Sequence, residues 1–98
     1  MAMARLIEET LTTDTSTAGL TVQGEFSLSL SGTFDGATVT VQRSHDAGAT
    51  YKDVDAFDAV TETYGYEPEF CKYRATVSSA GASTSIVIRL ARKSPDIH

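Results

Sequence analysis

The sequence predicts a small all-β protein, an antiparallel β-sandwich of about six to seven strands. Apolar and polar residues alternate over several short stretches, which is the pattern of a strand with one buried and one solvated face. Turn residues separate these stretches at intervals of roughly 8–12 residues, as is typical of sandwiches and barrels. No helical pattern of roughly 10–15 residues stands between the strands, as a parallel sheet would require.

The composition is that of one small globular domain. The chain has 98 residues, of which 41% are hydrophobic and 21% are charged. Its formal net charge of -5 argues against a nucleic-acid partner, because phosphate groups are bound by basic surfaces. No apolar run approaches the ~20 residues that span a bilayer, and residues 1–11 lack the apolar region of a secretory signal. We therefore expect no membrane partner and synthesis in the cytoplasm.

The N-terminal region has the least regular pattern. Residues 1–11 have a spacing that fits a short helix or a strand, but the threonines that follow disfavour helix because their side chains are β-branched. We expect residues 1–23 to form an N-terminal arm or an edge strand, extended from a sandwich domain that comprises residues 24–93. Residues 94–98 are expected to be a frayed tail.

The strand pattern is clear from Gly24 onwards. Residues 25–31 and 38–42 alternate strictly, and the Asp35-Gly36 turn between them predicts that they pair as a hairpin. Gly65 and Pro68 are expected to end one strand and separate it from the next. The further strands are expected over residues 51–57, 59–66, 69–78 and 86–91. The predicted core comprises Phe26, Leu28, Leu30, Val39, Val41, Val54, Tyr73, Ala75, Val77, Ile86, Ile88 and Leu90, with Val60 and Tyr64 as further inward candidates.

The most specific local motif is the turn at residues 44–51. Its sequence fits S-x-D-x-G-x-T-aromatic and resembles the Asp box of sialidase-type propellers. The Asp46 carboxylate is suited to accept backbone N–H bonds across the turn, and Gly48 to adopt a positive φ. Thr50 and Tyr51 then begin the returning strand, with the ring packed under the turn. These four residues are therefore expected to be structural rather than catalytic.

No set of residues predicts catalysis, a metal site or a cofactor. Ser44, His45 and Asp46 are adjacent, whereas the groups of a catalytic triad converge from separate positions. Cys71 is the only cysteine, so it is expected to be a small buried residue. The acidic residues Asp46, Asp53, Asp55, Asp58 and Glu62 do not have the spacing of an EF-hand. We expect a protein that is not an enzyme.

Tyr64 and Tyr66 flank a glycine near the end of a predicted strand. Two tyrosines on one side of an exposed segment are typical of a contact patch, because tyrosine buries a large area at a small cost in entropy. The alternative is that both rings lie over the rim of the core.

Two stretches of the sequence resemble small tailed-bacteriophage virion structural proteins with an Ig/fibronectin-like β-sandwich. These stretches are GEFSLSLSGTFDGATVTVQRSHDAGATYKDV and CKYRATVSSAGASTSIVIRLARK, which together cover most of the chain after Gly24. One departure is Tyr51, where tryptophan is commoner in the group. The resemblance implies a non-enzymatic subunit of a head decoration, a head–tail joint or a tail or fibre base, located in the virion. It also implies other virion proteins as partners and assembly as a homo-oligomer.

A second function remains open on the same residues. The Asp-box-like turn and the tyrosines Tyr51, Tyr64 and Tyr66 also fit a carbohydrate-binding or cell-surface-binding β-sandwich module. Binding to a glycan array that is lost on Tyr64→Ala would favour this alternative.

Overall fold

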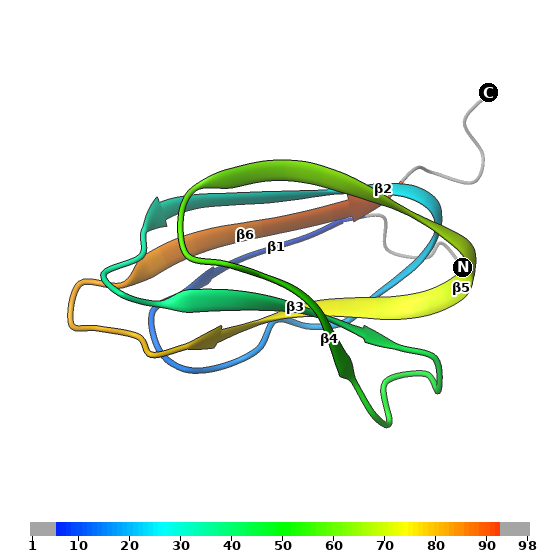
Figure 1. Cartoon of the computed structure of the whole chain (residues 1–98), viewed down its shortest axis with the longest axis horizontal. Helices are drawn as coiled ribbons and strands as arrows, with labels where there is room; N and C mark the ends of the chain where they lie inside the picture. Colours follow the sequence, from blue (N-terminus) through cyan, green and yellow to red (C-terminus); the bar gives the residue numbers. More distant parts are fainter. Residues whose placement is uncertain (1–5, 93–98) are drawn as a thin grey trace.

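The computed structural model describes residues 6–92, and this part of the chain is all-β (Figure 1). Its strands pair antiparallel throughout and form one sheet in the order β1-β6-β2-β5-β3-β4. This confirms the predicted fold class, with six strands. The strands are β1 (Leu6–Leu11), β2 (Leu20–Thr33), β3 (Thr38–Ser44), β4 (Lys52–Phe57), β5 (Thr61–Ser78) and β6 (Ser85–Arg92).

The single sheet folds over into two layers because β2 and β5 are long and belong to both (Figure 1). In the upper layer, the second half of β2 pairs with β6 and with the first half of β5, and β1 extends the layer beyond β6. In the lower layer, residues 72–78 of β5 pair with β3, and β3 pairs with β4. Residues 15–17 complete the lower layer through backbone hydrogen bonds to Ala75 and Val77.

β5 is one continuous strand, whereas the sequence predicted two strands separated at Gly65 and Pro68. The Pro68 position lies in a bulge, because the register with β2 shifts between Val22 and Gly24. A proline there breaks no ladder hydrogen bond. Gly65 is tolerated because the ring of Phe26, its cross-strand partner, lies over its backbone. The bulge is also where the two strands cross between layers.

The predicted hairpin between residues 25–31 and 38–42 is wrong. β2 pairs with β5 and β6, and β3 pairs with β4 and β5, so the Asp35-Gly36 turn connects the two layers instead. The turn itself is present, with a backbone hydrogen bond from Ala37 to Phe34. Phe34 and Ala37 are both buried. Their burial in the core between the layers keeps the two strands apart.

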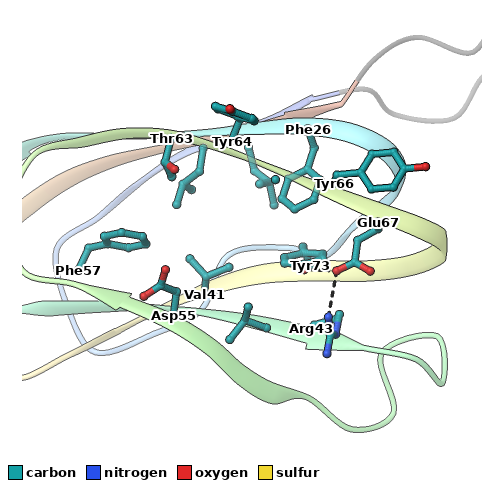
Figure 2. A pocket seen from close by; sticks show the side chains of 14 residues that line it. Phe26, Val41, Arg43, Asp55, Phe57, Thr63, Tyr64, Tyr66, Glu67 and Tyr73 are labelled. Carbon is teal, nitrogen blue, oxygen red and sulfur yellow. Dashed lines mark hydrogen bonds and ion pairs between the residues drawn. The ribbon is translucent and has the colours of Figure 1, made fainter.

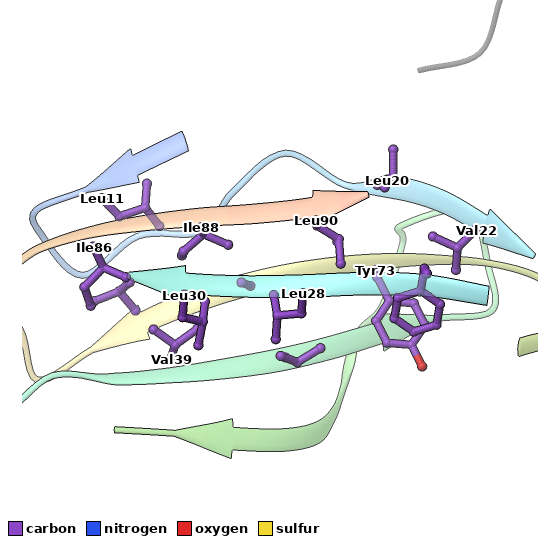
Figure 3. Close-up of a cluster of buried hydrophobic side chains, with 14 of the residues drawn as sticks. Leu11, Leu20, Val22, Leu28, Leu30, Val39, Tyr73, Ile86, Ile88 and Leu90 are labelled. Atoms are coloured by element: carbon purple, nitrogen blue, oxygen red, sulfur yellow. The ribbon is translucent and has the colours of Figure 1, made fainter. Parts of the chain in front are cut away.

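The core lies between the two layers and contains every predicted core residue except Val54 (Figure 3). Val54 is 46% exposed because it is the extra residue of a second bulge, where the register with β3 shifts between Val41 and Gln42. The inward expectation for Val60 and Tyr64 is also wrong, since both are exposed. The core further includes Leu11, Leu20, Val22, Phe34, Ala37 and Cys71, which the predicted list lacked.

The N-terminal part of the described chain belongs to the body of the fold. β1 is an edge strand paired with β6, and Leu11, Leu20 and Val22 are buried. The expected boundary between residues 23 and 24 falls inside β2, at its bulge. The tail at residues 94–98 lies outside the described residues. Over residues 6–92, the chain has no helix of the length and apolarity that crossing a membrane requires.

Candidate functional site

The turn between β3 and β4 is held by its own side chains. The Ser44 hydroxyl donates to Asp46 Oδ1 at 2.6 Å and accepts from the Gly48 N–H at 2.8 Å. The Asp46 carboxylate also accepts from the Thr50 N–H at 2.9 Å and from the Thr50 hydroxyl at 2.5 Å. These bonds satisfy the backbone groups that the tight turn would otherwise leave without partners. The Asp46 carboxylate therefore has a structural role, because the hydrogen bonds that it accepts hold the turn closed.

Gly48 and Tyr51 complete this turn. Gly48 has a φ of +94°, in the region where glycine is favoured. A Cβ at this position would lie 3.4 Å from both the Tyr51 hydroxyl oxygen and Lys72 Cδ, so the end of the Tyr51 side chain lies beside the turn. The Arg74 guanidinium lies over the Tyr51 ring, 3.9 Å from its centre, and so covers one face of the ring.

We expect Gly48→Val to destabilise the protein far more than His45→Ala. A β-branched residue at this positive φ costs about 2 kcal/mol, whereas His45 is exposed and its side chain takes no part in the turn's hydrogen bonds. The melting temperatures of the two purified variants and the wild type measure the difference. Equal melting temperatures for the two variants would show that the backbone geometry of Gly48 does not matter.

Acid is expected to destabilise this turn. The hydrogen bonds from Ser44 and then from Thr50 hold the pKa of Asp46 well below its ordinary value. A lowered pKa means that the unfolded state binds more protons, so this contribution to stability is present above about pH 4 and is lost as the pH falls further. The melting temperature of Asp46→Asn should therefore fall less than that of the wild type between pH 5 and pH 2 (roughly the range of carboxyl titration). Glu8→Gln, which removes an exposed carboxyl from β1, serves as the control for the loss of one carboxyl elsewhere in the chain.

Neither His45 nor Cys71 has the surroundings of a catalytic group. His45 is exposed and lies 3.9 Å from Glu69, while the Ser44 hydroxyl is buried and engaged in the turn. Cys71 is buried, as predicted, and its burial raises the pKa of the thiol to about 11. The thiol is therefore protonated at neutral pH, which is the unreactive form.

A groove opens on the side of the molecule where β4 and the first half of β5 face each other (Figure 2). It encloses about 290 Å³. Thr63 points into it from the upper layer, and Asp55 and Phe57 rise toward it from β4. Its floor is formed by core side chains, namely Phe26, Leu28, Val41, Tyr73 and Leu90. The groove is therefore an apolar opening between two strands, with a carboxylate at its mouth.

An ion pair between the buried Glu67 and the partly exposed Arg43 closes one end of the groove. Glu67, on β5, accepts hydrogen bonds from the Arg43 guanidinium of β3 at 3.0 Å and from the Tyr73 hydroxyl. Burial alone would raise the pKa of Glu67, but the hydrogen bonds from Tyr73 and Arg43 outweigh it and lower that pKa. The Tyr73 ring also packs against Phe26, with ring centres 4.6 Å apart. These contacts fix the position at which β5 crosses from one layer to the other.

The first half of β5 has a second edge that carries no strand. Residues 61–67 pair with β2 on one side, whereas β3 begins to pair only at Lys72 and β4 pairs with β3 alone. Within residues 6–92, no strand pairs with the other side of Thr61–Glu67. We call this stretch the open edge of β5. Alternate residues of such an edge direct their N–H and C=O groups outward, where a further strand can pair with them.

The surface around the open edge is acidic and aromatic. Residues 53–71, named here the acidic segment, contain six acidic residues and no Lys, Arg or His. Among the described residues, five of the six exposed large hydrophobic side chains also lie in this segment. The acidic residues are Asp53, Asp55, Asp58, Glu62, Glu67 and Glu69, and the exposed hydrophobic residues are Val54, Val60, Tyr64, Tyr66 and Phe70. The sequence pattern showed these residues but not the strand edge that they border.

Tyr64 and Tyr66, the expected contact patch, lie on the outer face of the open edge. Tyr64 is 81% exposed and Tyr66 is 68% exposed. They alternate with Thr63 and Gly65, whose cross-strand partners Leu28 and Phe26 are buried, so the two rings point away from the core. Figure 2 shows Tyr64 on the opposite side of the ribbon from the groove. The rings do not cover the rim of the core.

The acidic residues do not converge. Within residues 6–92, no group of three or more His, Cys, Asp or Glu side chains is close enough together to hold a metal ion. Asp53 accepts a hydrogen bond from Gln42, and Glu62 accepts one from Ser29.

Comparison of the chain with protein-family models, with curated proteins and with solved structures found no match.

Proposed function

We propose that this chain is a non-enzymatic structural subunit of a bacteriophage virion that acts through protein–protein contacts. The observation that carries the proposal is the concentration of exposed large hydrophobic side chains between Val54 and Phe70, beside the open edge of β5. Exposed apolar patches of this kind are typical of sites that bind another protein. The resemblance of residues 24–54 and 71–93 to small virion proteins supports the same assignment.

Assembly in several copies, with other virion proteins as partners, is part of this proposal. A domain of this size buries a single core, so contacts with neighbouring subunits add to its stability. The candidate positions are a head decoration, a head–tail joint and a tail or fibre base. In each of them the chain contributes a surface rather than a reaction.

The test is to locate the protein on particles. An antibody against the chain is applied to phage particles purified from a lysate of the strain that carries its gene, and labelled particles are imaged. The expected result is label at one position on the particle, together with a sedimentation mass of the purified chain that is a multiple of the monomer. Unlabelled particles and a strict monomer at high concentration would together overturn the proposal.

The second candidate is a carbohydrate-binding or cell-surface-binding module. It is favoured by one observation, the exposure of Tyr64 and Tyr66 on the same face of a strand. Aromatic rings exposed in this way stack on the apolar faces of sugars. Binding of the wild type to a glycan array, with loss of the signal for Tyr64→Ala, would support this function over the first.

A further inference from the structure

We infer that the open edge of β5 binds an extended strand of a partner protein in which Lys or Arg alternates with apolar residues. The inference rests on the proposed function, because it specifies which partner the protein–protein contacts select. The partner strand would extend the upper layer beyond β5 and close the groove against β4. Its contacts follow from the backbone, the charge and the side chains around the groove.

The backbone provides the first contact. The open edge extends over Thr61–Glu67 in a regular register with β2. At about 3.3 Å per residue this is roughly 23 Å, which is as long as a typical strand. Proteins usually cover or interrupt an edge of this length. Here the regular register ends only at the bulge beside Pro68, which leaves a complete template for strand addition.

The negative charge of the acidic segment determines which kind of partner strand the open edge can bind. The acidic segment carries six negative side chains and no positive one. A second copy of the chain would bring an identical acidic edge against this one, and like charges on adjacent strands are destabilising. Lys and Arg side chains on a partner strand would instead meet Glu62, which lies on the outer face with Tyr64 and Tyr66. The edge therefore fits a basic partner and disfavours pairing with itself.

The two faces of the added strand would meet different surfaces. Toward the groove, the partner's side chains would contact Phe57 and the core side chain Phe26, whose ring covers Gly65, so apolar residues fit. Toward the outside, they would lie beside the exposed rings of Tyr64 and Tyr66. A cation over a tyrosine ring is attracted by its electron-rich face. An alternating sequence satisfies both faces because successive side chains of a strand point in opposite directions.

The test uses synthetic peptides and the full chain. The first probe is a fluorescent decapeptide of alternating valine and lysine, acetylated and amidated at its ends. The second has the same sequence but is N-methylated at every second residue, in two versions that block either edge. The third alternates valine and glutamate. We expect saturable binding of the first probe, at least about tenfold weaker binding of one N-methylated version or both, and at least about tenfold weaker binding of the acidic peptide.

The N-methylated peptides separate strand pairing from simple charge attraction, because they keep all their lysines. Equal binding of the unmodified peptide and both N-methylated versions would overturn the inference. Absence of saturable binding of the unmodified peptide would do the same. Displacement of the peptide by a neutral oligosaccharide would also overturn the inference, since the surface would then be a glycan site.

A matched pair of variants locates the contact. Glu62→Gln removes one negative charge from the outer face of the open edge, and Glu8→Gln removes one from β1, which is separated from β5 by β6 and β2. We expect Glu62→Gln to weaken binding of the valine–lysine peptide by about threefold, while Glu8→Gln leaves it unchanged. Equal effects of the two variants would contradict the assigned position.

The outcomes also separate this inference from the proposed function. If antibody labels the particles but the peptide fails to bind the chain, the structural role stands and the edge is not the contact. If the peptide binds as expected but no particle is labelled, the edge is a strand-binding site and the virion assignment fails.

Discussion

Replacing Gly32 with alanine is expected to lower the free energy of unfolding by about 3 kcal/mol. Gly32 has a φ of +103° near the end of β2, opposite Ile86 of β6. A Cβ there would lie 2.2 Å from the carbonyl oxygen of Ser85, so the backbone of β2 or β6 must move. Both the conformational strain and the overlap act on the folded state. Thermal unfolding should show a melting temperature that is lower by roughly 15 °C.

Gly36 provides the matched control. It also has a positive φ, +84°, but a Cβ there meets nothing within 4 Å. Gly36→Ala therefore carries only the conformational cost of about 1 kcal/mol. A loss of stability for Gly32→Ala that is no larger than that for Gly36→Ala would show that β2 and β6 do not approach each other as closely as the structure has them.

Glu67→Ala is expected to lower the free energy of unfolding by a similar amount, about 3 kcal/mol. The Glu67 carboxylate is buried and accepts hydrogen bonds from Tyr73 and Arg43. Its removal leaves the hydroxyl of the buried Tyr73 without this acceptor and Arg43 without its counter-charge. It also removes the side-chain contact between β5 and β3 at the point where β5 crosses between the layers. Urea unfolding at neutral pH gives the difference from the transition midpoint.

Two further variants define what Glu67 contributes. Glu67→Gln keeps the shape and one acceptor oxygen, so we expect it to cost clearly less than Glu67→Ala. Arg43→Ala should also cost less, because the Arg43 side chain is 37% exposed and water can replace part of its contact with Glu67. If Glu67→Ala unfolds at the same urea concentration as the wild type, the ion pair does not hold the layers together.

The strands whose side chains alternate strictly were predictable from the sequence. In β6, Ile86, Ile88 and Leu90 are buried as expected, because a period of two fixes which face points inward. The interruptions of this period were not predictable. Val54 and Pro68 lie at bulges, and a bulge is set by the partner strand, which the local sequence does not reveal.

The connection between β2 and β3 shows the same limit. Asp35-Gly36 has the turn chemistry of a hairpin, and the turn is present. Whether the flanking strands pair or separate into two layers depends on the burial of Phe34 and Ala37, which is a property of the whole core. A turn sequence predicts that the chain changes direction, but it does not determine which strand each flanking strand pairs with.

The candidate site was visible in part. Tyr64 and Tyr66 were predicted from the sequence as a contact patch, whereas the carboxylates of β4 fit the solvated face of an ordinary strand. Their position became informative only through the pairing of β5, which leaves Thr61–Glu67 with a neighbour on one side. An unpaired edge depends on which strands do not meet, and that information is not local. The Asp46 turn, by contrast, is a short-range motif and its hydrogen bonds follow its sequence closely.

Amide hydrogen exchange of the purified chain, followed residue by residue by NMR, tests the open edge of β5 most directly. Residues 72–78 lie between neighbours on both sides, so their amides should be protected throughout. Over Thr61–Glu67, alternate amides should exchange rapidly while those that face β2 are protected. Continuous protection across Thr61–Glu67, or rapid exchange at every amide there, would contradict a formed strand with one side open.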